Sequence, residues 1–217
     1  LFFHVNPVSA LTQFTTDYKI SYTINLSGKT HVKYDISQTN NLSRVYATDF
    51  SLSVSHTNVE NLVIKDFDKS IDPDITLTNN ITNINFPFEN KIVGKDKTHK
   101  FSIEYDTNDI AIKTGTVWEV NIPKITTKEN INDLTITLQT PKVFPKLVFI
   151  DPKPTKIIDN LYTFSSHSLS NKPISALFGH EQYFDLTASY YLENNLSSTQ
   201  EKTIALPPNT SYQEVYV

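Results

Sequence analysis

The sequence predicts an all-β protein, an antiparallel β-sandwich of one large or two small packed sheet units. Apolar and polar residues alternate over many short stretches, which is the pattern of strands with one buried face. Turn-forming residues separate these stretches, as they do in sandwiches. No stretch repeats apolar residues at spacings of three, four and seven over three turns. Helices are therefore expected to be short or absent.

The first 40 residues predict a β-hairpin. Residues 18–26 alternate through three isoleucine or leucine and two tyrosine side chains. Residues 27–29 form a turn that contains Gly28, and residues 30–37 repeat the alternation. Two such runs around a short glycine-containing turn are typical of a hairpin.

Further strands are expected wherever the alternation returns. The prolines between residues 141 and 173 restrict that region to edge strands or extended connections. The expected strands lie within residues 50–54, 75–77, 84–88, 101–105, 118–122, 134–138, 147–150, 161–164 and 184–192.

The two ends of the chain predict its organisation. Residues 1–10 resemble the end of a secretory signal peptide, with an apolar start, Pro7 and small residues up to Ala10. We therefore expect an exported, extracytoplasmic protein. Residues 11–180 are expected to form the sandwich, with a sub-boundary considered near residues 106–115. Residues 181–217 resemble the opening hairpin and are expected to begin a second, truncated β domain.

Composition limits the classes of partner. A hydrophobic fraction of 38% in 217 residues is enough for a core, and a net charge of −4 with mixed signs indicates no nucleic-acid surface. No apolar run is long enough to span a membrane. The chain has no cysteine, which excludes disulfides, thiolate metal sites and a cysteine nucleophile within it.

Two acidic stretches are candidate cation sites. Carboxylates at alternate positions of a loop can bind calcium through their oxygens, and the sequence offers Asp66, Asp68, Asp72 and Asp74. The glycine and the late glutamate of an EF-hand loop are missing, so a plain solvated loop is the favoured interpretation. Residues 106–109 form a weaker candidate of the same kind.

Trp118 is the candidate ligand platform. An exposed tryptophan can stack on a sugar ring, whereas a tryptophan in an alternating strand is usually a core residue. Trp118 shares its strand face with Val120 and Ile122, which favours the core. No pair of histidines has helical zinc-site spacing, and no catalytic residue and no cofactor is predicted.

Several longer stretches carry a family resemblance. They are residues 101–111 (FSIEYDTNDIA), 117–124, 133–141, 151–154 and 204–216. Together they resemble the N-terminal β region of large exported bacterial proteins that hold a transglutaminase-like domain further along. The layout is also similar to the N-terminal β domain of M1-type aminopeptidases and to the lumenal domain of ribophorin I.

The resemblance implies a role without chemistry of its own. In these families the β region is a scaffold or docking part, and the catalytic residues lie in another domain. We therefore expect a non-catalytic scaffold that contacts the downstream domain of the same polypeptide, or a protein or glycan partner at the cell surface. The alternative is a carbohydrate or surface-polymer binding module. A stand-alone hydrolase is the least favoured interpretation.

Overall fold

The computed structural model describes residues 12–125, 130–169, 172–180, 185–210 and 213–215. The chain divides into two units, residues 1–180 and 181–217. The described part of the first unit is almost entirely β, as the sequence predicts. Its one helix is α1, Ser166–Leu169. The predicted signal-peptide remnant, residues 1–10, lies outside the described residues.

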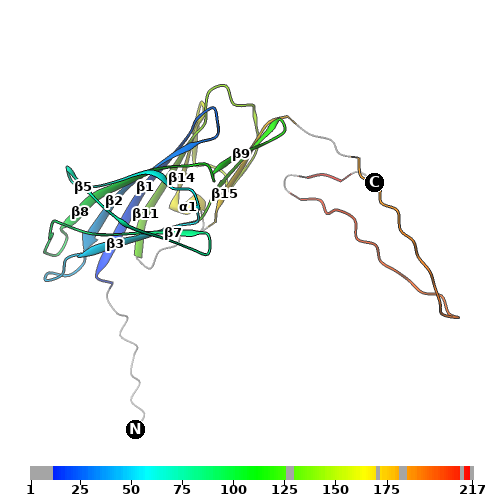
Figure 1. The fold of residues 1–217 in the computed structure, drawn as a ribbon, viewed down its shortest axis with the longest axis horizontal. Coiled ribbons are helices and arrows are strands. Elements are labelled where there is room, and N and C mark those ends of the chain that lie inside the picture. The colour runs from blue at the N-terminus through cyan, green and yellow to red at the C-terminus, as the bar shows by residue number, and fades with distance from the viewer. Residues whose placement is uncertain (1–11, 126–129, 170–171, 181–184, 211–212, 216–217) are drawn as a thin grey trace, which may run out of the picture. The chain divides into compact units, whose positions relative to one another are not determined.

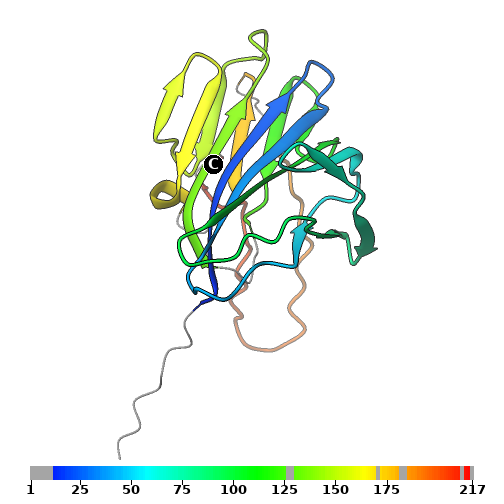
Figure 2. The same cartoon turned by 90° about the vertical axis from the view of Figure 1, so that its left-hand side faces the viewer.

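Eight strands form the large sheet, in the order β13-β14-β11-β1-β2-β8-β4-β5. Their bounds are β1 Phe14–Ile24, β2 Thr30–Asn40, β4 Glu60–Asp66, β5 Lys69–Ile71, β8 Thr98–Thr107, β11 Asn130–Gln139, β13 Lys156–Ile158 and β14 Leu161–Ser165. Strands β1 and β2 are the predicted hairpin, and they pair antiparallel along their whole length. Figure 2 shows them in blue beside β11 in yellow-green.

One pairing differs from the antiparallel prediction. Strand β1 pairs parallel with β11, with Tyr18 opposite Leu134. A parallel pair needs a long connection, and here all the strands from β2 to β10 separate the two partners. Sequence alternation defines the face of a strand but gives no information about its direction relative to a distant neighbour.

Two smaller sheets cover one face of the large sheet. One has the order β3-β7-β6 and the other the order β12-β15-β10-β9. Their bounds are β3 Asp49–Val54, β6 Asp74–Thr78, β7 Ile81–Pro87, β9 Ala111–Thr114, β10 Val117–Ile122, β12 Leu147–Asp151 and β15 Ile174–Phe178. Figure 1 shows β3 and β7 as a layer apart from β1, β2 and β8. The first unit is therefore a sandwich of three sheets.

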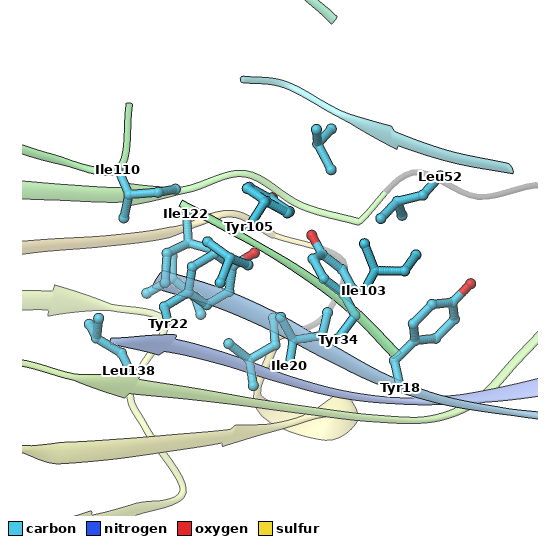
Figure 3. Packing of buried hydrophobic residues seen from close by; sticks show 14 of the residues in the cluster. Tyr18, Ile20, Tyr22, Tyr34, Leu52, Ile103, Tyr105, Ile110, Ile122 and Leu138 are labelled. Carbon is cyan, nitrogen blue, oxygen red and sulfur yellow. The ribbon is translucent and has the colours of Figure 1, made fainter. Parts of the chain in front are cut away.

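The core lies between these layers and contains an unusual number of tyrosines. Tyr18, Tyr22, Tyr34 and Tyr105 are buried on the inner face of the large sheet, beside aliphatic side chains such as Ile103. Figure 3 shows these side chains on the same side of β1, β2 and β8. The Tyr22 and Tyr34 hydroxyls hydrogen-bond to each other, which satisfies polar groups that burial would otherwise leave unpaired.

Short strands account for most of what the sequence pattern missed. Strands β5, β9 and β13 have only three or four residues, too few to show alternation. Strand β4 has a buried pattern only at its end. Strand β15 is a nearly continuous apolar run rather than an alternating one.

The second unit differs from its prediction. The sequence predicts a hairpin of residues 183–192 and 202–206. Residues 183 and 184 lie outside the described residues, and the described residues of this unit form no strand. They contain a single isolated bridge, between Thr210 and Gln213. An isolated two-stranded hairpin is marginal in water without a sheet or helix against its apolar face. Leu186, Tyr190 and Leu192 are exposed in this stretch.

Candidate functional site

The large sheet has a polar outer face that is open to solvent in the described part of the first unit. The alternation that buries Tyr18 and Ile20 directs Lys19 and Ser21 to the opposite side. Most side chains on this side are polar and half-exposed or exposed, and the apolar Val63 of β4, Ile158 of β13 and Leu161 of β14 lie on the same side. We define the outer face by Asp17, Lys19, Ser21 and Thr23 of β1; His31, Lys33, Asp35, Ser37 and Thr39 of β2; Thr98, Lys100, Ser102, Glu104 and Asp106 of β8; Thr135, Thr137 and Gln139 of β11; and Thr163 and Ser165 of β14.

Contacts within and between strands order several of these side chains. The hydroxyls of Thr39 and Thr98 lie 2.9 Å apart. Lys33 Nζ lies 3.4 Å from a carboxylate oxygen of Asp35 and 3.4 Å from one of Glu104. Side chains that are already held in place lose less conformational freedom when a partner binds. The outer face is therefore a preorganised polar surface.

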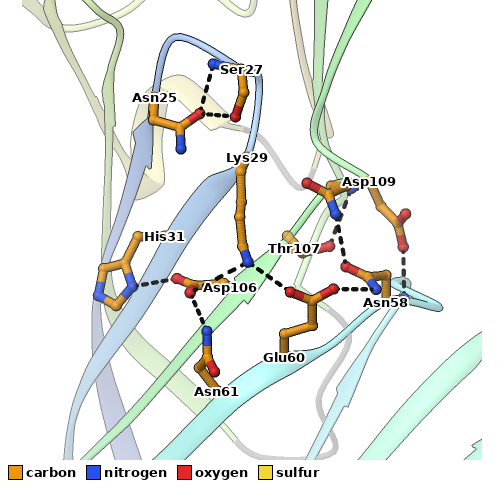
Figure 4. Close-up of polar contacts among 11 residues, drawn as sticks. Asn25, Ser27, Lys29, His31, Asn58, Glu60, Asn61, Asp106, Thr107 and Asp109 are labelled. Atoms are coloured by element: carbon orange, nitrogen blue, oxygen red, sulfur yellow. Dashed lines mark hydrogen bonds and ion pairs between the residues drawn. The ribbon is translucent and has the colours of Figure 1, made fainter.

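A charged cluster lies at one end of the outer face, where β2, β4 and β8 are neighbours (Figure 4). We define it as Lys29, His31, Glu60 and Asp106. Lys29 Nζ lies 2.6 Å from Glu60 Oε2 and 3.9 Å from Asp106 Oδ2. His31 Nδ1 lies 2.9 Å from Asp106 Oδ1, and Asn61 Nδ2 donates to Asp106 Oδ2 at 2.8 Å.

These contacts keep both carboxylates of the cluster ionised at neutral pH. The hydrogen bond from Lys29 lowers the pKa of Glu60, and the hydrogen bonds from Asn61 and His31 lower that of Asp106. The hydrogen bond to Glu60 raises the pKa of Lys29. A general acid needs a raised carboxyl pKa, which is the opposite of this arrangement. The cluster is suited to fixing charge positions and to recognition.

Asp109 ties the loop between β3 and β4 to this end of the sheet. Its Oδ2 accepts hydrogen bonds from the backbone N–H groups of Thr57 at 2.7 Å and Asn58 at 3.1 Å. Burial acts to raise the pKa of Asp109, but the hydrogen bonds from Asn58 and Thr57 outweigh it, and the pKa is lowered. Residues 106–109, the weaker cation candidate, thus hold the cluster and this loop together.

The four aspartates of the first calcium candidate lie in different environments. Asp66 is buried in β4, with Oδ1 2.6 Å from His99 Nε2. Asp68 is exposed in the β4–β5 turn, Asp72 lies between β5 and β6, and Asp74 begins β6. Within the residues that the structure describes, no three acidic or histidine side chains are placed to hold a metal ion. Asp66 is therefore not part of a solvated loop, whereas Asp68, Asp72 and Asp74 are exposed.

Trp118 lies in the core, as its strand position favours. It is 8% exposed and stacks on Phe144, with ring centroids 4.8 Å apart. A buried indole offers no open platform for a sugar, so the carbohydrate alternative loses the residue on which it was based. Lys113 Nζ lies 5.8 Å from the centroid of the same ring.

The sequence pattern does not predict the charged cluster. Its members come from the β1–β2 turn, β2, β4 and β8, which are far apart in the chain. The only signal was the acidic run at residues 106–109, taken as a cation site because its partners were unknown. Strand β4, which supplies Glu60, was not predicted.

Comparisons with known proteins give remote likenesses of fold. No family model and no curated protein matches the sequence. Similar solved structures include an aminopeptidase N family protein from Idiomarina loihiensis, with 10% identity, a TM-score of 0.47 and coverage of 74% of this chain and 29% of that one. Leukotriene A4 hydrolase from Saccharomyces cerevisiae has 12% identity and a TM-score of 0.46, with coverage of 80% of this chain and 32% of that one. An M1 zinc metallopeptidase from Deinococcus radiodurans has 8% identity and a TM-score of 0.43, with coverage of 77% of this chain and 42% of that one.

The chain spans less than a third of the length of the first two of these proteins, at 29% and 32%. The similar structures thus include M1-type peptidases, which the layout of the sequence also resembles. No activity follows from this likeness. In the described residues, no helix is both long and apolar enough to cross a membrane.

Proposed function

We propose that the first unit is a non-catalytic docking scaffold whose outer face binds another protein domain. One observation supports this function above the others. The eight-stranded sheet is covered on its inner face by two smaller sheets, and its outer face is largely polar and open in the described part of the unit. Such a surface provides many fixed donors and acceptors for a complementary protein surface.

The charge on the outer face favours a protein partner over a polyanion. Lysines alternate with carboxylates, and Lys33 is already paired with Asp35 and Glu104. A nucleic-acid surface needs an excess of unpaired cations to neutralise phosphates. Interspersed and paired charges instead select a partner by complementarity, because like charges placed opposite each other are penalised.

The partner that we propose is the transglutaminase-like domain of the same polypeptide, located outside the cytoplasm. The sequence resemblance supports this identity, and the predicted signal-peptide remnant supports the location. An alkaline phosphatase fusion after residue 180 of the natural gene product tests the location. Activity of the fusion outside the cytoplasm is expected, and activity only after cell lysis contradicts it.

Site-specific crosslinking in the full-length polypeptide tests the docking face. A photoreactive p-benzoylphenylalanine replaces Ser21 or Thr163 on the outer face. The control position is Thr76, which is exposed on β6 of a small sheet. Mass spectrometry is expected to find crosslinks from Ser21 and Thr163 to residues of the downstream domain, and few from Thr76. Equal crosslinking from Thr76, or none from the outer face, overturns the proposal.

A further inference from the structure

A pocket of about 260 Å³ opens beside the β13–β14 turn, on a different part of the first unit from the charged cluster. The β11–β12 connection, residues 141–146, forms one wall. Asp159 and Asn160 of the β13–β14 turn form the opposite wall. Tyr162 and Phe178 lie at its base, and both are buried.

Backbone contacts hold the two walls in place without a ligand. Thr140 N–H donates to Asn160 O at 3.1 Å, and the Asn160 side-chain amide donates back to the Thr140 carbonyl. Gly179 N–H donates to Lys146 O at 2.9 Å, and Phe144 N–H closes a turn on Pro141 O at 3.0 Å. When a pocket is formed before binding, ordering its loops costs little free energy on binding.

Aromatic rings form the base of the pocket. Phe144 is fixed by stacking on Trp118 at 4.8 Å and by an edge contact with Phe178 at 5.8 Å. Tyr162 contacts Phe178 in the same edge-on manner at 5.8 Å. Burial alone raises the pKa of Tyr162, so its phenol stays protonated and can donate a hydrogen bond at neutral pH. Trp118 thus supports the aromatic base from behind.

The rim of the pocket is polar and has a net positive charge. Lys142 and Lys146 lie on one wall and Asp159 on the other. None of these three side chains has an ion-pair partner among the described residues. Two lysines and one aspartate, none of them in an ion pair within the described residues, therefore line an opening with an aromatic base.

We propose that this pocket binds a monosaccharide-sized sugar acid. The apolar face of the pyranose ring would lie against Phe144 and Tyr162, and its carboxylate would lie between Lys142 and Lys146. Its hydroxyls would donate to Asp159 and accept from the Tyr162 phenol. The inference does not depend on the docking face.

Each part of the pocket favours this class of ligand over simpler ones. A neutral sugar leaves both lysines without an anionic partner. An aromatic acid fills the base and pairs with a lysine, but it gives Asp159 no donor. A free inorganic anion uses the lysines and leaves the aromatic base uncovered. Small ligand sites combine an apolar floor with a few placed polar groups, as here.

Titration of the ¹⁵N-labelled 217-residue chain by amide NMR tests the proposal. The probes are sodium glucuronate, glucose, benzoate and inorganic phosphate, each added separately at equal ionic strength. Glucuronate is expected to shift the amides of Leu147, Asn160 and Tyr162 saturably. Its dissociation constant should be at least about tenfold lower than those of the other three probes, a difference of about 1.4 kcal/mol.

Matched variants localise the site. Lys142→Glu with Lys146→Glu is expected to weaken glucuronate binding at least about tenfold. Tyr162→Phe keeps the ring, removes one hydrogen bond and should weaken binding about fivefold. The charge-matched control is Lys95→Glu with Lys97→Glu, in an exposed loop away from the pocket, and it should bind like the parent.

Several results overturn the assignment. Benzoate or phosphate binding as tightly as glucuronate shows that the site is not specific for a sugar acid. Shifts scattered over surface lysines, or an unchanged dissociation constant in the Lys142/Lys146 variant, exclude the pocket as the site. Amide spectra of each variant without ligand show whether the fold is kept. Tyr162→Phe keeps the test valid if the double variant does not fold.

Discussion

His99 Nε2 lies 2.6 Å from Asp66 Oδ1, and both side chains are buried. Strands β8 and β4, which hold them, are neighbours in the large sheet. The His99 ring packs against Phe88 at 4.1 Å and Phe67 at 5.7 Å between centroids. Aromatic rings thus exclude water from the pair, and Asp66 is a structural residue of the sandwich.

Removing one member of this pair should destabilise the fold strongly. Asp66→Ala leaves His99 buried without its partner, and losing half of a buried pair costs about 3 kcal/mol or more. The free energy of unfolding is measured by urea denaturation at pH 7. Asp68→Ala, in the neighbouring exposed turn, is the control and should stay within about 0.5 kcal/mol of the parent. Equal effects of the two substitutions would show that Asp66 contributes only as a surface residue.

His56 should make the stability of the fold depend on pH between about 5 and 7. It is 2% exposed, neither ring nitrogen has a hydrogen-bond partner among the described residues, and burial lowers its pKa from 6.5. The charge of Asp109 opposes this shift only in part, and the neighbouring Tyr105 phenol is neutral in this range. In this pH range the unfolded chain therefore binds a proton at His56 that the folded chain does not bind. The free energy of unfolding is not reduced by His56 above about pH 6.5, and it falls as the pH drops from there towards the lowered pKa.

His56→Phe should remove this dependence while preserving the packing. Urea unfolding at pH 7.5, 6.5 and 5.5 is compared between the parent and the variant. The parent should lose more stability over this interval, by about 1.4 kcal/mol for each full unit of pKa shift. Asp109 and Asp106 have lowered pKa values, so they affect stability only at lower pH, below about 4. Parallel pH profiles for the two proteins would show that His56 binds its proton equally well in the folded and the unfolded chain.

The architecture could largely be predicted from period-two alternation. That pattern located the β1–β2 hairpin and the faces of β3, β7, β8 and β10, because each strand buries one face and exposes the other. The third sheet and the parallel β1–β11 pair depend on which distant strands meet. A single sequence contains no signal for such pairings.

The candidate sites were harder to predict than the fold for the same reason. Asp66 and Asp106 both belong to acidic runs in the sequence, but their partners His99, Lys29 and His31 lie in distant parts of the chain. Residue type indicated a cation site, whereas the partners made these carboxylates structural or part of the charged cluster. The pocket likewise depends on the clamp between Thr140 and Asn160, which no local pattern indicates.

Tyr105→Phe should leave the stability unchanged or raise it slightly at neutral pH. The Tyr105 hydroxyl is buried and has no partner of good hydrogen-bond geometry in the part of the chain that the structure describes, although Tyr34 is near enough to perturb its pKa. Removing an unsatisfied buried hydroxyl relieves a desolvation cost. Tyr22→Phe is the contrasting variant, because it breaks the hydrogen bond to Tyr34 and should cost about 1 kcal/mol.

Alkaline titration gives a second measurement on the same tyrosines. Burial raises the pKa of Tyr22, Tyr34 and Tyr105, so the folded chain keeps protons that the unfolded chain releases above about pH 10. Stability should therefore fall as the pH rises through 10, and it should fall less steeply in Tyr105→Phe. A loss of stability at pH 7 as large as that of Tyr22→Phe would mean that the Tyr105 hydroxyl is satisfied after all.

Gly28 is a position where the chain tolerates no side chain. It has φ +90°, and a Cβ there would lie 2.7 Å from Trp118 Cζ3 and 2.9 Å from the Ala111 carbonyl oxygen. Gly28→Ala should therefore combine backbone strain of about 1 to 3 kcal/mol with an overpacking cost of similar size. Gly94, at φ +121°, is the control, because a Cβ there would meet only the flexible Lys97 side chain, at 3.2 Å.

The two glycine variants separate strain from steric conflict. Gly94→Ala should show the strain alone, so Gly28→Ala should be less stable by at least about 1 kcal/mol in urea unfolding. A double-mutant cycle identifies the cause of this excess: in a Trp118→Leu background, Gly28→Ala should cost measurably less than in the parent. If the cost of Gly28→Ala is the same in both backgrounds, a steric conflict with Trp118 does not contribute to that cost. The backbone conformation of Gly28 alone then accounts for the need for glycine.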